Sequence, residues 1–153
     1  MDMRSFGRAA AASAAVAYAS MTMAAPAGRL VEITGSDQMK FSVTSITAKP
    51  GELLHVRLKS VGTLPKIVMA HNFVLLAKGT DATAFANAAA LAATTAYIPA
   101  QFKAKVLAST ALAGPGETVD VTFKAPAVAG QYVYLCSFSG HFIAGMKGVL
   151  AVK

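Results

Sequence analysis

The stretch LLHVRLK at residues 53–59 alternates, from its second residue onward, between apolar and polar side chains, and this pattern limits what the chain can fold into. Leu54, Val56 and Leu58 fall on one face of an extended chain, whereas His55 falls on the other face beside two cationic side chains. A period of two residues is that of a half-buried β-strand, because the faces of a helix repeat every ~3.6 residues. The stretch therefore predicts a strand with one buried face, and it places His55 in solvent.

Seven further runs are rich in β-branched, leucine and aromatic residues and also predict strands. They lie at residues 30–33, 40–46, 71–76, 105–109, 117–123, 131–136 and 148–152. Turns rich in proline and glycine, such as KPGE, VGTLP, GPGE and PAVAGQ, separate many of these runs at short intervals. Short strands with closely spaced turns are typical of an all-β sandwich rather than of βαβ units. The sequence therefore predicts a Greek-key β-sandwich of about eight strands.

One segment breaks the β pattern. TDATAFANAAALAATTA, at residues 80–96, begins with a good N-cap in Thr80 or Asp81 and continues with strong helix formers. It predicts one short helix inserted between strands. Neither an internal repeat nor a second domain is evident, so residues 28–153 are expected to form one domain.

The first 27 residues differ in composition from the rest of the chain. Arg4 and Arg8 precede an uncharged alanine-rich run, and small residues suitable for a signal peptidase follow, with plausible cuts after Ala24 or Ala27. The run falls short of the ~20 strongly apolar residues that a membrane-spanning helix needs. Residues 1–27 are therefore interpreted as a signal peptide, the alternative being a disordered alanine-rich tail. We expect export to the periplasm, or to the extracytoplasmic membrane surface if the segment is retained, without stable membrane insertion.

The chain is basic, with a formal net charge of +7. Residues 1–27 contain two Arg and one Asp, so the remaining chain carries +6. Its lysines are spread from Lys40 to Lys153 without a run and without interleaved aromatic residues, so the sequence does not indicate a nucleic-acid groove. The charge instead favours long-range attraction to an acidic partner or an anionic membrane surface.

Cys136 is the single cysteine of the chain. In an exported protein it has no internal disulfide partner, and its thiol would meet an oxidising compartment. Most free cysteines are protected by burial as small apolar residues, but a bound metal ion protects a thiolate as well. Cys136 ends a predicted strand, His141 follows a glycine-containing turn, and Met146 precedes the final strand. Two imidazoles, one thiolate and a weak axial thioether are the ligands of copper sites that only pass electrons.

A second histidine must come from elsewhere in the chain. His55 is predicted to face solvent beside cations, whereas His71 precedes the apolar run FVLL, so His71 is the candidate. The alternatives are ordinary ones: a cysteine near a histidine is often accidental, and a methionine near a strand is commonly core filler. A nucleophilic Cys–His pair would need an orienting third residue in a cleft, and nothing in the sequence suggests one.

Three stretches, GSDQMKFSVTSI, LPKIVMAHNFVL and YLCSFSGHFIAGMKGVLAVK, resemble signature stretches of the azurin and auracyanin branch of the blue (type 1) copper proteins. The resemblance covers nearly all of residues 30–153 and implies a cupredoxin-like fold. The spacing C-x4-H-x4-M resembles the auracyanins more than the azurins, which typically have one residue fewer between His and Met. The disulfide of the azurins is missing, with Arg29 and Glu52 near its positions, and Phe73 stands where azurins commonly carry Trp.

The resemblance implies one type 1 copper ion held by His71, Cys136, His141 and Met146. It also implies a second weak axial neighbour in the carbonyl of Ala70, where the family usually has Gly, and a role for Asn72 in tying the ligand loops together and orienting the thiolate.

The implied function is that of a monomeric single-electron carrier rather than an enzyme. Copper would cycle between Cu(I) and Cu(II), and transient redox partners would dock at apolar residues around His141. The predicted docking patch consists of Phe142, Ile143, Ala144 and Gly145, with residues 62–65 beside it. A copper chaperone or store is the alternative, but such a protein would favour exposed, Met-rich sites.

Overall fold

The structure, a computed structural model, describes residues 27–153. In this part of the chain the strands are β1 (Arg29–Ser36), β2 (Lys40–Phe41), β3 (Ser45–Ala48), β4 (Leu53–Ser60), β5 (Val74–Leu76), β6 (Val106–Ser109), β7 (Thr118–Lys124), β8 (Gly130–Leu135) and β9 (Lys147–Val152). Each predicted run overlaps a strand, and the run at 40–46 overlaps both β2 and β3. The predicted signal peptide lies, apart from Ala27, outside the described residues.

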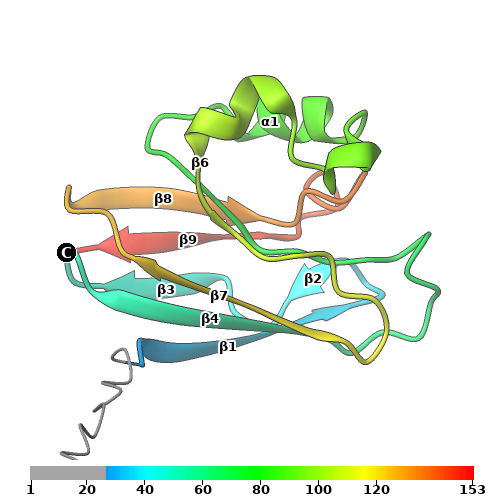
Figure 1. Ribbon diagram of the computed structural model, residues 1–153, viewed down its shortest axis with the longest axis horizontal. Coiled ribbons are helices and arrows are strands. Elements are labelled where there is room, and N and C mark those ends of the chain that lie inside the picture. Colours follow the sequence, from blue (N-terminus) through cyan, green and yellow to red (C-terminus); the bar gives the residue numbers. More distant parts are fainter. Residues whose placement is uncertain (1–26) are drawn as a thin grey trace, which may run out of the picture.

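The strands form two sheets that pack face to face (Figure 1). The first sheet has the order β2-β1-β4-β7 and the second has the order β3-β9-β8-β5-β6. β1 pairs with β4 and β3 pairs with β9 in parallel, whereas the remaining pairs are antiparallel. The predicted all-β sandwich is confirmed, and its strand order is consistent with Greek-key connections.

The main core lies between the two sheets, and β4 contributes to it as its alternation predicts. Leu54, Val56 and Leu58 are fully buried. On the outer face, His55 Nε2 lies 2.7 Å from Asp120 Oδ1, and Arg57 Nε donates to the same oxygen at 2.9 Å. His55 is therefore occupied by a carboxylate on the outside of the sandwich.

The inserted helix is real but shorter than predicted. Helix α1 (Ala82–Ala89) begins after Asp81, whose side chain accepts hydrogen bonds from two backbone N–H groups of the first turn. It buries Phe85 and Ala89, whereas Leu91 beyond its end is 92% exposed. Alanine-rich segments of this length need an apolar face to stay helical, so the helix ends where that face ends. Two 3₁₀ turns follow, η1 (Ala93–Thr95) and η2 (Ala100–Lys105), and only the first lies within the predicted helix.

Residues 82–105, which include α1, η1 and η2, are called the helical segment below. A second apolar cluster lies beneath it. Phe85 and Ala89 pack with Val74, Leu76, Leu135 and Phe142, so the helix covers the outer face of β5 and β8. Figure 1 shows the segment above the five-stranded sheet. Within residues 27–153 no helix is both long and apolar enough to span a membrane.

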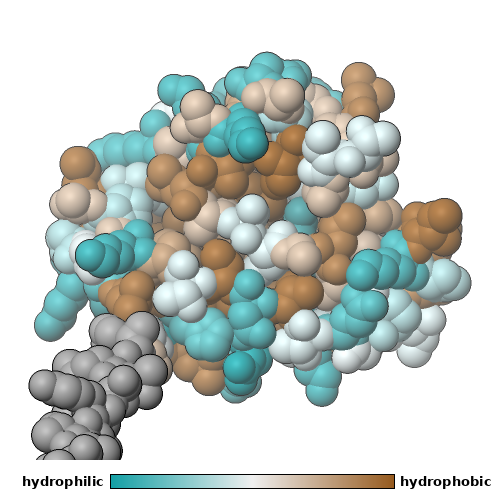
Figure 2. Space-filling view, in the orientation of Figure 1, coloured by the Kyte–Doolittle hydropathy of each residue, from teal (hydrophilic) through white to brown (hydrophobic). Residues whose placement is uncertain are grey.

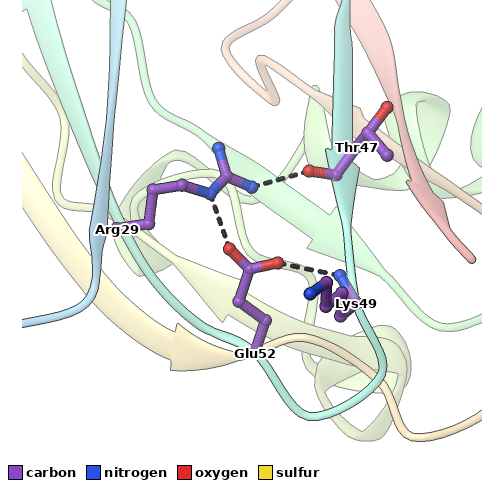
Figure 3. Close-up of polar contacts among 4 residues, drawn as sticks. All are labelled: Arg29, Thr47, Lys49 and Glu52. Atoms are coloured by element: carbon purple, nitrogen blue, oxygen red, sulfur yellow. Dashed lines mark hydrogen bonds and ion pairs between the residues drawn. The ribbon is translucent and has the colours of Figure 1, made fainter.

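The connections β1–β2, β4–β5, β6–β7 and β8–β9 all reach the right-hand end of the molecule in Figure 1. The opposite end holds an ion pair (Figure 3). There Arg29 Nε donates to Glu52 Oε1 at 2.6 Å, the Arg29 guanidinium also donates to the Thr47 carbonyl, and the Lys49 N–H donates to Glu52 Oε2. A polar link thus joins β1 to the β3–β4 turn, near the positions where the resemblance to azurins would have placed a disulfide.

Candidate metal centre

The loop between β8 and β9 folds back on itself and brings its chemistry-bearing side chains to one point. The Cys136 N–H donates to the Met146 carbonyl at 3.0 Å, and the Met146 N–H donates to the His141 carbonyl at 2.9 Å. Gly140 (φ 82°) and Gly145 (φ 97°) make the two reversals, in a backbone region that side-chain-bearing residues seldom adopt. The loop thereby brings Cys136, His141 and Met146 close together, although each is five residues from the next.

His71 reaches the same point from the β4–β5 connection. Its N–H donates to the Ala113 carbonyl at 3.0 Å and its carbonyl accepts from the Ala113 N–H at 2.8 Å, so the β6–β7 connection holds both polar groups of its backbone. The side chain is fully buried. Of the two histidines left open by the β8–β9 loop, the structure brings His71 to the loop and leaves His55 on the outer sheet face.

The potential donor atoms of His71, Cys136 and His141 all lie within 4.8 Å of one another. Cys136 Sγ is 3.4 Å from His141 Nδ1, and the two imidazole rings have centroids 5.1 Å apart. Neither ring nitrogen of His71 has a hydrogen-bond partner within residues 27–153, although both are buried. Buried polar atoms are normally paired, and a metal ion held between His71, Cys136 and His141 would satisfy one of these two nitrogens.

Met146 completes the cluster, and a glycine makes room for it. A Cβ atom on Gly35 in β1 would lie 2.9 Å from both Cγ and Cδ2 of His71 and 2.9 Å from the Met146 methyl carbon. The methionine methyl group and the imidazole therefore lie against the same stretch of bare backbone. Met146 is fully buried.

The two loops that carry His71 and Cys136 are tied by the residues that follow them. Asn72 Oδ1 accepts from the Ser137 N–H at 2.8 Å, and Asn72 Nδ2 lies 2.8 Å from Ser137 Oγ. This is the tie that the resemblance implied for Asn72. The Ala70 carbonyl oxygen lies 3.8 Å from Cys136 Sγ, so it borders the site, whereas its contact with a metal ion stays a prediction.

Burial controls the protonation of the metal-free site. It raises the pKa of Cys136 to about 12, although N–H groups of Asn72 and Phe138 act in the opposite direction. It lowers the pKa of His141 to about 4, with a smaller contribution from His71 beside it. The pKa of His71 is also lowered by burial, against an opposing attraction to Asp37. At neutral pH the imidazoles are therefore free to donate their lone pairs, and metal binding must displace the thiol proton.

Sequence reasoning missed two residues that shape this end of the molecule. Gly35 is one of them. The other is Asp37, whose Oδ2 accepts from the Thr63 N–H at 2.8 Å and which leaves no space for a Cβ atom on Gly62. Both belong to the stretch GSDQM that carried part of the family resemblance, and that resemblance was the available signal.

A β-sandwich with two histidines, a cysteine and a methionine buried together at one end defines a cupredoxin-like copper protein. The chain belongs to the plastocyanin/azurin family of copper binding proteins, whose family model matches residues 29–153. It is therefore a copper-binding protein, and the resemblance found in the sequence is confirmed.

Relatives and solved structures agree with this assignment. Azurin-1 of Alcaligenes xylosoxydans xylosoxydans is 41% identical over 123 residues, which are 78% of this chain and 94% of that protein. Auracyanin-B of Chloroflexus aurantiacus is 36% identical over 117 residues, or 76% of this chain, and the match spans only 48% of that relative's length. The structure of Na-dithionite-reduced auracyanin from Roseiflexus castenholzii superposes with a TM-score of 0.72 at 31% identity, covering 84% of this chain and 99% of that one.

Proposed function

We propose that the protein is a single-electron carrier whose one copper ion is held by His71, Cys136, His141 and Met146. The observation that carries the proposal is the buried His71 imidazole, which has no hydrogen-bond partner within residues 27–153, with donor atoms of Cys136 and His141 within 4.8 Å. When bound, copper supplies one-electron chemistry by alternating between Cu(II) and Cu(I). In this assignment Cys136 binds as the thiolate, the imidazoles bind as neutral rings, and Met146 is the weak axial donor.

The scaffold around these side chains supports electron transfer because hydrogen bonds within the protein hold it. His71 is fixed through Ala113, Asn72 is tied to Ser137, and the Cys136 N–H is bonded to the far end of its own loop. A site that keeps its geometry in both oxidation states has little reorganisation to undergo when an electron arrives or leaves.

The closure of the site favours a carrier over an enzyme. All four proposed ligands are 2% exposed or less. A catalytic metal site keeps a coordination position open to water or substrate, and this enclosed donor set offers no such approach. The same burial disfavours a copper chaperone or store, whose ligands must be reached by the protein that receives the metal.

Partners are proposed to dock at the end of the molecule where the site lies. The expected patch is smaller than the sequence indicated, because Phe142 is buried in the second apolar cluster and Ile143 is the large apolar side chain of that loop left exposed, at 70%. The β4–β5 loop adds Leu64, Ile67 and Val68, all exposed. Figure 2 shows apolar surface at the right-hand tip, over this loop. These four residues are called the docking surface below.

A small apolar docking surface suits a transient redox partner, because little buried area allows rapid release. The positive net charge attracts an acidic partner, so association should slow as salt is added. Ile143→Lys should sharply lower the electron self-exchange rate, since like charges would face each other between two copies, while the visible spectrum stays unchanged. An unchanged self-exchange rate would show that electrons leave by another face.

Export completes the proposal. Residues 1–27 are proposed to be removed as a signal peptide, leaving a monomeric cupredoxin domain of residues 28–153 in the periplasm. The intact mass of native material tests this, because a retained N-terminus would instead indicate a tethered protein.

The central test is spectroscopic. Oxidised, copper-loaded protein should show an intense visible charge-transfer band, a narrow parallel copper hyperfine splitting, and reversible uptake of one electron per chain. A colourless copper complex, or a stoichiometry other than one copper per chain, would refute the proposed site.

A further inference from the structure

A continuous series of aromatic contacts runs from the helical segment to the metal centre. The Tyr97 ring lies 4.7 Å from the Phe138 ring, and the Phe138 ring lies 4.9 Å from the His141 imidazole, measured between centroids. Tyr97 follows η1, whereas Phe138 and His141 belong to the β8–β9 loop. The helical segment therefore touches the site through these rings.

The His141 ring depends on packing for its orientation. Within the described part of the chain its one hydrogen-bond contact is that of Nδ1 with Cys136 Sγ, which is itself a proposed ligand. Metal-binding histidines are usually oriented by a hydrogen bond from the second ring nitrogen to a carbonyl or carboxylate. Here the neighbouring aromatic rings are those of Phe138 and His71. Since His71 is also a proposed ligand, Phe138 is, among the aromatic neighbours within residues 27–153, the ring from outside the ligand set that can hold the imidazole in place.

The backbone that places Tyr97 against Phe138 has an unusual, left-handed conformation. Ala96 (φ 52°) and Tyr97 (φ 62°) are consecutive non-glycine residues in the left-handed region. Such conformations are disfavoured for alanine and tyrosine and persist where surrounding contacts impose them, often near functional sites.

The contacts that impose this turn come from the turn itself and from the cores. The Tyr97 N–H donates to the Ala92 carbonyl at 2.9 Å, and the Thr95 hydroxyl lies within hydrogen-bond distance of the Ala92 and Ile98 carbonyls. The Tyr97 side chain packs against both apolar clusters of the protein. The turn is thus stabilised by its own hydrogen bonds and by packing against both clusters. In this conformation the Tyr97 ring contacts Phe138.

We propose that Tyr97 is a positioning residue for the metal centre, which sets the orientation of the His141 imidazole through Phe138. The inference deepens the proposed function and rests on His141 being a copper ligand. The helical segment covers β5 and β8, and the proposal gives it a second role, which is to orient a metal ligand. A Tyr97 that only filled space would affect stability and leave the imidazole unchanged.

The experiment compares Tyr97→Leu, which removes the ring, with Tyr97→Phe, which keeps it. Leu91→Ala is the matched control, because Leu91 belongs to the same segment and is almost fully exposed. The metal-free proteins are examined by NMR of the His141 ring, and the copper-loaded proteins by visible absorption and electron paramagnetic resonance. We expect Tyr97→Leu to shift and broaden the His141 ring signals and to shift both the charge-transfer band and the parallel hyperfine splitting. Tyr97→Phe and Leu91→Ala should match the wild type in all of these.

Wild-type ring signals and a wild-type copper spectrum in Tyr97→Leu, with only stability reduced, would overturn the proposal. If Tyr97→Leu does not fold, Thr95→Val weakens the turn while keeping the ring, and it should produce the same shifts in smaller degree; unaltered spectra would then count against Tyr97. If wild-type protein failed to form a blue copper site, the proposed function would fall, whereas the NMR comparison would still show whether Tyr97 controls the His141 ring.

Discussion

Replacing Gly35 by Ala should disturb the metal centre, although Gly35 provides no ligand atom. The added Cβ would stand 2.9 Å from two ring carbons of His71 and 2.9 Å from the Met146 methyl carbon. Carbon atoms in contact prefer ~3.5–4.0 Å, so each neighbour must retreat by roughly 0.6 Å or more. His71 has little freedom to do so, because Ala113 holds both the N–H and the carbonyl of its backbone. Overpacking of this kind costs ~1–3 kcal/mol of stability, and we expect the metal-free variant to lose an amount in that range.

Two measurements separate damage to the site from a general loss of stability. Urea unfolding of the metal-free variant gives the change in stability, and the spectrum and reduction potential of the copper-loaded variant report on the ligands. Gly114→Ala is the control for overpacking away from the ligands, since its added Cβ would lie 2.7 Å from Lys66 Cβ; it should lower stability while leaving the spectrum and the potential unchanged. A Gly35→Ala protein with wild-type stability, spectrum and potential would refute the contact between this backbone, His71 and Met146.

Three further outcomes are expected. Cys136→Ser abolishes the blue colour, because a hydroxyl does not replace a soft thiolate, whereas the control His55→Ala keeps the wild-type visible spectrum. Met146→Leu retains copper but raises the reduction potential measured by voltammetry, since losing a weak donor disfavours Cu(II); a lowered potential would exclude an axial role. The hydrogen bond from Arg29 holds the pKa of Glu52 below its usual 4.5, so the stabilisation is present above that value and is lost as the pH falls through the lowered pKa. The urea midpoints of wild type and Glu52→Gln should therefore converge in acid, and a constant gap would rule out the ion pair as its cause.

The strands and the proposed ligands could be predicted because each depends on short-range pattern or on scarce chemistry. The alternation at 53–59 needed only the period of an extended chain, and it also placed His55 outside. One cysteine and three histidines left few ways to build a soft metal site, so burial of the FVLL run was enough to select His71. Composition and residue spacing were therefore enough to predict both the strands and the proposed ligands.

The features that could not be predicted depend on contacts between distant segments. Helix α1 ends early because its apolar face ends, and alanine-rich propensity does not reveal where that face meets a partner. Phe142 is buried because the helical segment and β5 offer it a cluster, whereas Ile143 beside it has none. The left-handed backbone at Tyr97 also depends on the two apolar clusters against which its side chain packs, and the need for glycine at position 35 depends on His71 and Met146, which other segments supply.

The register of two neighbouring strands explains why the site forms where it does. β5 and β8 are antiparallel, with Val74 opposite Leu135, and continuing this register by two residues places Asn72 opposite Ser137. The observed bonds between Asn72 and Ser137 show that the pairing persists beyond the ends of the strands. Because side chains alternate between faces, a slip of one residue would send the His71 imidazole to the opposite face from the one that Cys136 meets. The hydrophobic pattern that sets the register of the sheet therefore also places the histidine and the thiol on the same face.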